Sequence, residues 1–287
     1  MRPSSVAAVH ILKITSPGSD KNAFASSPAE DLLAVETPLE IRIVYGPEKE
    51  RKQKNISVTM CTPGHDAELA TGFLFTEGII NHREDIMKCA APNESGISGG
   101  NIVIAELKPG ISFDIQKIER HFYTSSSCGV CGKSSIDAVK NVFTGERKTD
   151  QLIVAAAVLN QLPGTLRKQQ KVFEHTGGLH ASALFDMSGE LLITREDVGR
   201  HNALDKLVGA ALIAGDVPLD HHILLLSGRA SFELIQKAAM AGIKIVCAVG
   251  APSSLAVELA KDCGMTLVGF LRDGRFNIYS GEQRIKN

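Results

Sequence analysis

Residues 223–271 read ILLLSGRASFELIQKAAMAGIKIVCAVGAPSSLAVELAKDCGMTLVGFL, and this stretch decides the fold of the C-terminal part. Three apolar runs, the expected strands, alternate with two segments whose apolar residues recur at helical spacing. These five elements are expected at 223–226, 231–241, 244–249, 252–262 and 266–271. The first two runs are almost wholly apolar, which is typical of strands buried on both faces. Strand–helix alternation with short links predicts right-handed crossovers and a parallel sheet between helices.

Outward from this stretch, the elements become more mixed. A last strand is expected downstream, and a helix, a hairpin around Met187-Ser188-Gly189 and two helical segments are expected upstream. The first third should hold a hairpin, a helix and two further strands. These elements are expected at 276–279, 199–214, 180–186 with 191–194, 153–161, 163–174, 39–45 with 56–60, 66–77, 101–107 and 111–115.

The predicted organisation has two folded parts behind a leader. Residues 36–133 are expected to form a mixed α+β subdomain, and residues 134–287 an α/β subdomain. Residues 1–35 are rich in Ser, Pro, Ala and Asp and lack an apolar core followed by a cleavage site. They are therefore expected to be a poorly ordered leader and not a secretory signal.

Composition excludes several classes of partner. The net charge is −1 with a pI of about 6.8, so there is no global basic field for nucleic acid or an anionic membrane. Trp is absent and aromatics make up 5% of the chain, which argues against stacked recognition of single strands. No apolar run is long enough to cross a bilayer. The six cysteines are too sparse for a disulfide scaffold, which predicts a reducing, cytoplasmic location.

The strongest chemical signal is the loop Cys128-Gly129-Val130-Cys131-Gly132, which follows a serine-rich run and precedes Lys133. Thiolates are both nucleophiles and soft metal ligands, and two of them lie here on a pliable backbone. Lys133 and the start of the helix expected to follow would lower a nearby thiol pKa. A cysteine in this setting can accept a sulfur atom as a persulfide and pass it on.

Three other interpretations of the CxxC pair remain open. A structural zinc site would need two more ligands, usually a second CxxC or HxxxH, and neither pattern occurs. A thioredoxin-like redox pair would follow an early strand of a βαβ unit, whereas this pair follows a polar loop. Accidental spacing is the third alternative, and the flanking glycines argue against it.

A second candidate site lies where the expected parallel strands end. Ser227-Gly228-Arg229-Ala230-Ser231 and the loop at 250–254 each lead from a strand into a helix, where free N–H groups attract anions. The next strand ends in Arg272-Asp273-Gly274-Arg275, which adds two guanidinium groups suited to phosphate. Ligands of open α/β sheets bind at this edge. The pattern favours a nucleotide or phosphate ligand over three ordinary turns with solvated arginines.

Two further features stay open. The polar stretch from Arg195 to Asn202 is consistent with substrate binding and equally with a solvated loop held by internal ion pairs. His175 and His180 are isolated, and isolated histidines are more often structural than ligands.

Five blocks of the sequence together resemble the FdhD-type formate dehydrogenase accessory sulfurtransferases. They are TSSSCGVCG at 124–132, TGGLHASALFD at 176–186, EDVGRHNALDKL at 196–207, SGRASFELIQKAAMAG at 227–242 and APSSLAVELA at 251–260. The resemblance implies a cytidine-deaminase-like, three-layer α/β fold in the C-terminal part, with a smaller mixed α+β N-terminal part. It also implies a homodimer.

The resemblance further implies a sulfur carrier that serves formate dehydrogenase. Sulfur would come from a cysteine desulfurase as a persulfide on Cys128 and pass to the molybdenum bis-molybdopterin guanine dinucleotide cofactor. Cys131 matches the second cysteine of the family pair, whose role is less settled. The segment that binds the cofactor in the family matches Phe270, Leu271, Arg272, Asp273, Gly274 and Arg275 in this sequence. Ser227 and Arg229 are further candidates, because they lie in the loop that leads from an expected strand end into a helix.

The relation to deaminases does not imply deamination. Those enzymes need a histidine and a glutamate two residues later to hold zinc and activate water. His180-Ala181-Ser182 has serine at that position and follows the CxxC pair instead of preceding it, so no zinc is expected. The alternatives to a persulfide carrier are a zinc-dependent, deaminase-like hydrolase and a non-catalytic chaperone that delivers the cofactor.

Overall fold

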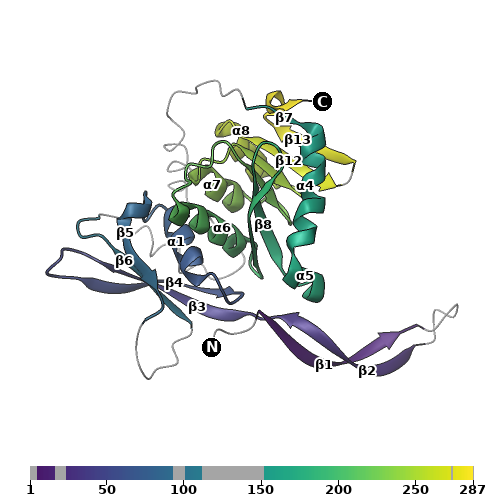
Figure 1. The fold of residues 1–287 in the computed structure, drawn as a ribbon, viewed down its shortest axis with the longest axis horizontal. Helices are drawn as coiled ribbons and strands as arrows, with labels where there is room; N and C mark the ends of the chain where they lie inside the picture. Colours follow the sequence, from purple (N-terminus) through teal and green to yellow (C-terminus); the bar gives the residue numbers. More distant parts are fainter. Residues whose placement is uncertain (1–4, 17–23, 93–100, 112–151, 273, 287) are drawn as a thin grey trace.

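The computed structural model describes residues 5–16, 24–92, 101–111, 152–272 and 274–286 (Figure 1). A six-stranded mixed sheet forms the centre, in the order β13-β12-β11-β10-β8-β9. The adjacent strands β10, β11 and β12 are parallel, whereas β8, β9 and β13 run antiparallel to their neighbours. The bounds are β8 His180–Phe185, β9 Leu191–Asp197, β10 Ile223–Leu226, β11 Ile245–Ala248, β12 Thr266–Arg272 and β13 Arg275–Ser280.

Helices cover both faces of this sheet, as the nearly continuous apolar strands predict. On one face, Leu159, Leu162 and Leu166 of α4 (Ala156–Gln169) belong to the same apolar cluster as Phe185 and Leu225 of the sheet. The other face is covered by α6 (Arg200–Ala214), α7 (Phe232–Met240) and α8 (Ser254–Asp262). The C-terminal part is therefore three layers deep, while its specific likeness to cytidine deaminases stays a prediction.

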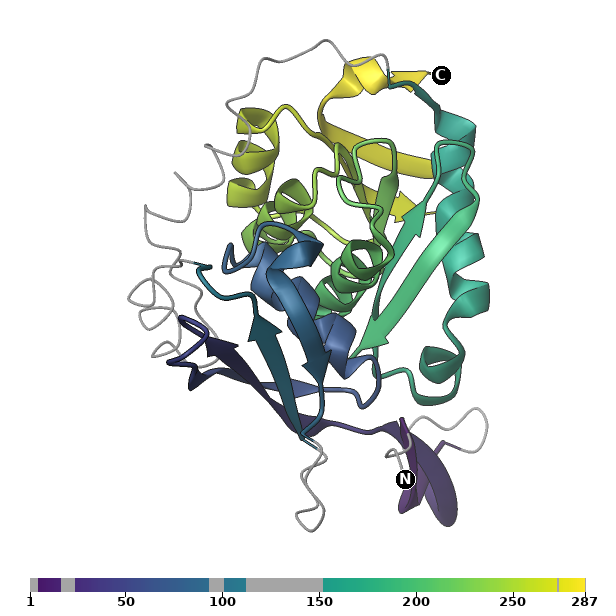
Figure 2. The ribbon, with the colours of Figure 1, turned by 60° about the vertical axis from the view of Figure 1, so that its left-hand side comes forward.

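A second sheet belongs to the N-terminal part. The helix α1 (Asp66–Thr76) lies between this sheet and α6 and contacts both (Figures 1 and 2). Its four strands lie in the order β4-β3-β6-β5. They span β3 Thr37–Tyr45, β4 Lys52–Cys61, β5 Ile86–Ala90 and β6 Ile102–Leu107. The helices α1 and α6 cross at Gly72 and Gly209, where a Cβ on Gly72 would lie 1.8 Å from the Asp205 carbonyl oxygen. Only glycine permits this close approach.

The expectation of a poorly ordered leader at residues 1–35 is wrong for the described part of that range. β1 (Val6–Thr15) and β2 (Ala25–Ala34) pair over ten residues as an antiparallel hairpin. The hairpin projects from the body as an arm in line with β3 (Figure 1). The prediction of disorder used only the amino-acid composition of this segment. Composition does not show whether two segments can pair, because strand pairing depends on their mutual register.

Most other elements lie close to their predicted bounds. One correction concerns α4, which continues through Pro163 although a break was expected there. The shorter α5 (Lys171–Thr176) follows directly. Short pieces complete the chain: β7 Val154–Ala155, β14 Ile285–Lys286, and the 3₁₀ turns at Arg83–Asp85 and Glu282–Arg284. Residues 112–115 of the strand expected at 111–115, the CxxC loop with its helix, and the boundary at 133/134 lie outside the described residues.

Candidate functional site at the carboxyl edge of the sheet

The loops that follow the parallel strands lie side by side, as predicted. Gly250 N donates to the Gly228 carbonyl oxygen at 2.9 Å, and Phe270 N donates to the Gly250 oxygen at 3.0 Å. An isolated parallel bridge also joins Ala230 to Pro252. The sheet hydrogen bonding thus continues into the loops, which fixes their backbone beyond the strand ends.

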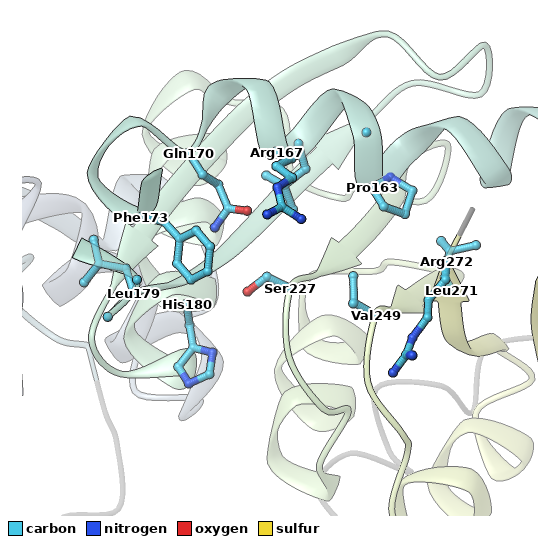
Figure 3. A pocket seen from close by; sticks show the side chains of 14 residues that line it. Pro163, Arg167, Gln170, Phe173, Leu179, His180, Ser227, Val249, Leu271 and Arg272 are labelled. Atoms are coloured by element: carbon cyan, nitrogen blue, oxygen red, sulfur yellow. The ribbon is translucent and has the colours of Figure 1, made fainter. Parts of the chain in front are cut away.

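A cavity of about 620 Å³ opens at this edge, on the face covered by α4 (Figure 3). That volume lies within the range of small-molecule sites, about 300–1,000 Å³. Its wall combines α4, the junction with α5, the turn before β8 and the ends of β10, β11 and β12. The lining residues are Pro163, Gly164, Leu166, Arg167, Gln170, Phe173, Gly177, Gly178, Leu179, His180, Ser227, Val249, Leu271 and Arg272.

The charges on the cavity wall favour an anionic ligand. Arg167 and Arg272 line it, and the described lining residues include no Asp or Glu. The turn that carries Arg272 is anchored to α4, because Gly274 N donates to Asn160 Oδ1 at 2.7 Å. Two guanidinium groups from different elements therefore reach one cavity, and no carboxylate among the described lining residues neutralises them.

The structure brings together only some of the residues predicted for this site. Ser227, Leu271 and Arg272 line the cavity. Phe270 is 39% exposed and lies outside the lining, with a left-handed backbone at φ 52°. Arg229 is exposed, and a Cβ on Gly250 would lie 3.0 Å from Arg229 Cγ.

Arg229, Gly274 and Arg275 are likewise absent from the described cavity lining. Arg275 is exposed at the start of β13. Asp273, Cys128 and Cys131 lie outside the described residues. The helix N-termini predicted at Ser231 and Pro252 are observed at Phe232 of α7 and Ser254 of α8. Both helices lie on the opposite face of the sheet from α4.

Ser227 holds the β10 loop against β8. Its backbone N–H donates to the Ala181 carbonyl oxygen at 2.9 Å, and its Oγ accepts from Ala181 N at 2.8 Å. His180, which precedes Ala181 in β8, is half-buried. Burial together with the charges of Arg200 and His201 lowers the pKa of its imidazole. His180 is therefore neutral at pH 7 and leaves the two arginines as the charged groups of the cavity wall.

Sequence reasoning missed the wall supplied by Arg167, Gln170 and Phe173. Gln170 lies at the junction of α4 and α5 and is 7% exposed. Reading a break at Pro163 hid the continuous helix that brings these side chains over the sheet. A long 3.6-residue period through Leu159, Leu162 and Leu166 was the available signal.

The polar stretch from Arg195 to Asn202 makes structural contacts, and its Asp197 and Asn202 side chains are buried. Asp197 Oδ2 lies 2.7 Å from Lys206 Nζ, which also donates to the Thr62 carbonyl oxygen at 2.8 Å. Arg195 Nη2 donates to Glu68 Oε1 at 2.9 Å. These contacts join the two sheets, and they show that the stretch holds internal ion pairs.

Two described thiols are too buried for sulfur chemistry. Burial raises the pKa of Cys61 and of Cys247 to about 12 each, so both stay protonated at neutral pH. Cys247 is a core residue of β11, as expected. Among the described residues, no three His, Cys, Asp or Glu side chains are grouped to hold a metal ion.

Fold and cavity together define a class: a layered α/β protein with a basic ligand pocket at the carboxyl edge of its sheet. Sequence comparison gives the family, because a profile of the FdhD/NarQ family matches residues 34–286. The chain therefore belongs to the FdhD/NarQ family.

Named relatives agree with that membership. The "Sulfur carrier protein FdhD" of Mycolicibacterium paratuberculosis is 51% identical over 258 residues, 89% of this chain and 92% of that protein. The protein of the same name from Thermoplasma volcanium is 42% identical over 282 residues, 97% of this chain and 99% of the relative. A crystal structure of a putative formate dehydrogenase accessory protein from Desulfotalea psychrophila shares the fold. Its TM-score is 0.71 at 23% identity, covering 97% of this chain and 99% of that one.

None of the helices in the described ranges combines the length and apolar character that a bilayer crossing requires.

Proposed function

We propose that this protein is a cytoplasmic sulfurtransferase that carries sulfur for the maturation of formate dehydrogenase. In this proposal, Cys128 accepts sulfur from a cysteine desulfurase as a persulfide and delivers it to the molybdenum bis-molybdopterin guanine dinucleotide cofactor, which is the substrate. The observation that carries the proposal is the cavity whose described lining holds two arginines and no carboxylate, in a chain of the FdhD/NarQ family.

The acceptance step needs one exposed thiolate. The Cys128 sulfur attacks the terminal sulfur of the desulfurase persulfide, the sulfur–sulfur bond breaks, and the desulfurase thiolate leaves. Electrons balance without an added oxidant, because one persulfide is exchanged for another. The pKa values of Cys61 and Cys247 argue against either thiol in this role. Cys89 is also disfavoured, since burial raises the pKa of its thiol.

The cavity suits the guanine nucleotide portion of the cofactor. Arg272 lines it, and Arg275 is adjacent across the turn, with the two residues paired in register. Phosphate oxygens would lie against these guanidinium groups, which bind such anions with two parallel hydrogen bonds. The residues present therefore fit the phosphates of the proposed substrate.

Loss of sulfur transfer should follow from loss of the Cys128 thiol alone. Cells that carry Cys128→Ala should lack formate dehydrogenase activity, whereas Cys247→Ala should retain it. Full activity with Cys128→Ala would favour a non-catalytic delivery chaperone. Absence of zinc stays a prediction, which elemental analysis of the purified protein tests.

We also propose that two copies pair through the β1–β2 arm. A two-stranded ribbon is marginal alone in water, yet Leu12 and Ile14 are 63% and 55% exposed on one face and Leu33 is 46% exposed on the other. An arm about 34 Å long and about 10 Å wide has a face of about 340 Å². Two such arms, each covered by a second copy, would bury about 1,400 Å² in total, the size of a stable interface.

A further inference from the structure

A second cavity, the β9-edge cavity, lies where the central sheet ends at β9 and has a volume of about 370 Å³. Among the described residues, only Leu179 lines both this cavity and the larger one. Its walls include Thr62 from the loop before α1, Thr194 and Glu196 from β9, and Val172 from α5. The volume is at the lower end of the range of small-molecule sites, about 300–1,000 Å³, so a ligand here would be small.

Two polar groups at this cavity can make further hydrogen bonds. Thr194 Oγ1 is buried and has no partner in the part of the chain that the structure describes. The Lys206 side chain lines the cavity and is 1% exposed. Its ammonium group has three N–H donors, and two oxygens lie on it: Asp197 Oδ2 at 2.7 Å and the Thr62 carbonyl oxygen at 2.8 Å. A ligand oxygen that accepts from Thr194 and Lys206 would therefore offset the cost of burying them.

The cationic side chains that line this cavity are already balanced. His65 Nδ1 lies 3.0 Å from Glu68 Oε2, and Arg195 Nη2 donates to Glu68 Oε1 at 2.9 Å. Lys206 is balanced by Asp197. The β9-edge cavity therefore does not favour a ligand with a net negative charge, in contrast to the larger cavity.

Glu196 is the carboxyl group of this lining and has neutral partners. Burial raises the pKa of Glu196, and neutral N–H donors oppose the rise: the backbone of Phe173 and of Val172, and the Gln170 amide. The Phe173 N–H donates to Glu196 Oε1 at 3.3 Å. Hydrogen bonds between two charged groups are stronger than those with a neutral donor, so a cationic ligand group would stabilise this carboxylate.

The positions of these groups suit one small molecule that carries both charges. Thr194 and Glu196 are two residues apart in β9, so their side chains leave the same face of the strand, about 7 Å apart along it. An α-amino acid has its carboxylate and its ammonium group on a single carbon atom. Val172 and Leu179 supply an apolar wall for a small side chain.

We propose that the β9-edge cavity binds a free α-amino acid with a small side chain. The ligand carboxylate accepts hydrogen bonds from Thr194 and Lys206, and its ammonium group contacts Glu196. This site is separate from the nucleotide cavity and does not rest on sulfur transfer by Cys128.

Calorimetric titration of the full-length protein with L-alanine, propionate and ethylamine tests the site. Propionate is alanine without the ammonium group, and ethylamine is alanine without the carboxylate. L-alanine should bind about tenfold or more tightly than either analogue, because each analogue lacks one charge-assisted contact.

Two substitutions separate the two halves of the ligand. Glu196→Gln should weaken L-alanine binding about tenfold and leave propionate nearly unchanged. Glutamine retains a carbonyl oxygen that can accept from Phe173 N, so the contact with α5 is kept. Thr194→Val should weaken L-alanine and propionate alike, about fivefold, as expected for one hydrogen bond. It should not lower the free energy of unfolding of the ligand-free protein, because it removes a buried hydroxyl that has no described partner.

The matched control is Glu190→Gln, which makes the same change at an exposed residue of the β8–β9 hairpin outside the described cavity lining. It should bind L-alanine as wild type does. Equal losses in Glu190→Gln and Glu196→Gln would reduce the effect to a change in net charge and overturn the assignment. Equal affinity of wild type for L-alanine and propionate would show that no ammonium group is recognised. Wild type that binds none of the three compounds would mean that the cavity holds only water.

Discussion

Lys206 Nζ lies 2.7 Å from Asp197 Oδ2, with the two side chains only 1% and 0% exposed. The ion pair connects α6 to the end of β9, and Thr62 joins it from the N-terminal part, where its backbone N–H donates to Asp197 Oδ2 at 3.1 Å. A pair this deeply buried is costly to form but more costly to break, because removal of one partner leaves an uncompensated charge.

Lys206→Met should therefore destabilise the protein strongly. The expected loss is about 3–5 kcal/mol in the free energy of unfolding, the usual cost of breaking a buried pair. Arg42→Ala is the matched control, since its pair with Glu40 at 2.9 Å is partly exposed and should contribute less than about 1 kcal/mol. Urea denaturation of both variants measures the difference, and equal losses would contradict the assigned role of burial.

Acid should weaken the contact between α6 and α7. The imidazole of His201, whose Nε2 lies 3.8 Å from Glu233 Oε2, lowers the pKa of Glu233 to about 2 against the opposing effect of burial. A carboxyl with a lowered folded-state pKa contributes stability above its unfolded pKa, about 4.3, and that contribution is lost as pH falls towards 2.

The contribution of Glu233 is found by comparing the pH dependence of stability in the wild type with that in Glu233→Gln. The denaturation midpoint of the wild type should fall more between pH 5 and pH 2.5 than that of Glu233→Gln, which cannot ionise. Parallel pH profiles for the two proteins would mean that Glu233 has an ordinary pKa in the folded state.

The arm provides a direct test of the proposed dimer. Replacing Leu12 and Ile14, which lie on the same face of β1, with glutamate should shift the protein from dimer to monomer, because burying two charges against a second copy is unfavourable. Val58→Glu, at a residue 60% exposed on β4, is the control and should stay dimeric. Light scattering after size-exclusion chromatography gives the mass. Dimers of the arm variant would show that the interface lies elsewhere.

Binding of phosphate at the turn should depend on one guanidinium group and on salt. A charge-assisted contact contributes about 1.5–3 kcal/mol, so Arg272→Ala should weaken GDP binding about tenfold or more. The difference from wild type should shrink as salt rises, since Arg272 is exposed and screened. Titrations at low and high salt check both expectations. Affinity equal to wild type in Arg272→Ala would mean that this turn is not the phosphate site.

The sequence predicted the C-terminal sheet well because β10 and β11 are continuous apolar runs whose only stable place is between helices. The loop residues Ser227 and Arg272 were found for a related reason, since parallel strands deliver their ends to one edge. The β1–β2 arm was missed because the turn residues Pro17-Gly18 do not by themselves establish a pairing that is set by register over ten residues. Gln170 and Phe173 were missed because their approach to Ser227 depends on how α4 packs across the sheet, a contact between distant segments.

Intact-mass analysis after incubation with a cysteine desulfurase and cysteine tests the central claim most directly. The protein should gain one sulfur atom, and peptide mapping should place it on Cys128, because the small residues around it in the sequence and the nearby Lys133 favour a reactive thiolate. Arg272→Ala should gain the same sulfur, because accepting sulfur and binding the cofactor use different residues. A sulfur atom mapped to Cys61 or Cys247, or no gain in mass, would contradict the account of this protein as a persulfide carrier.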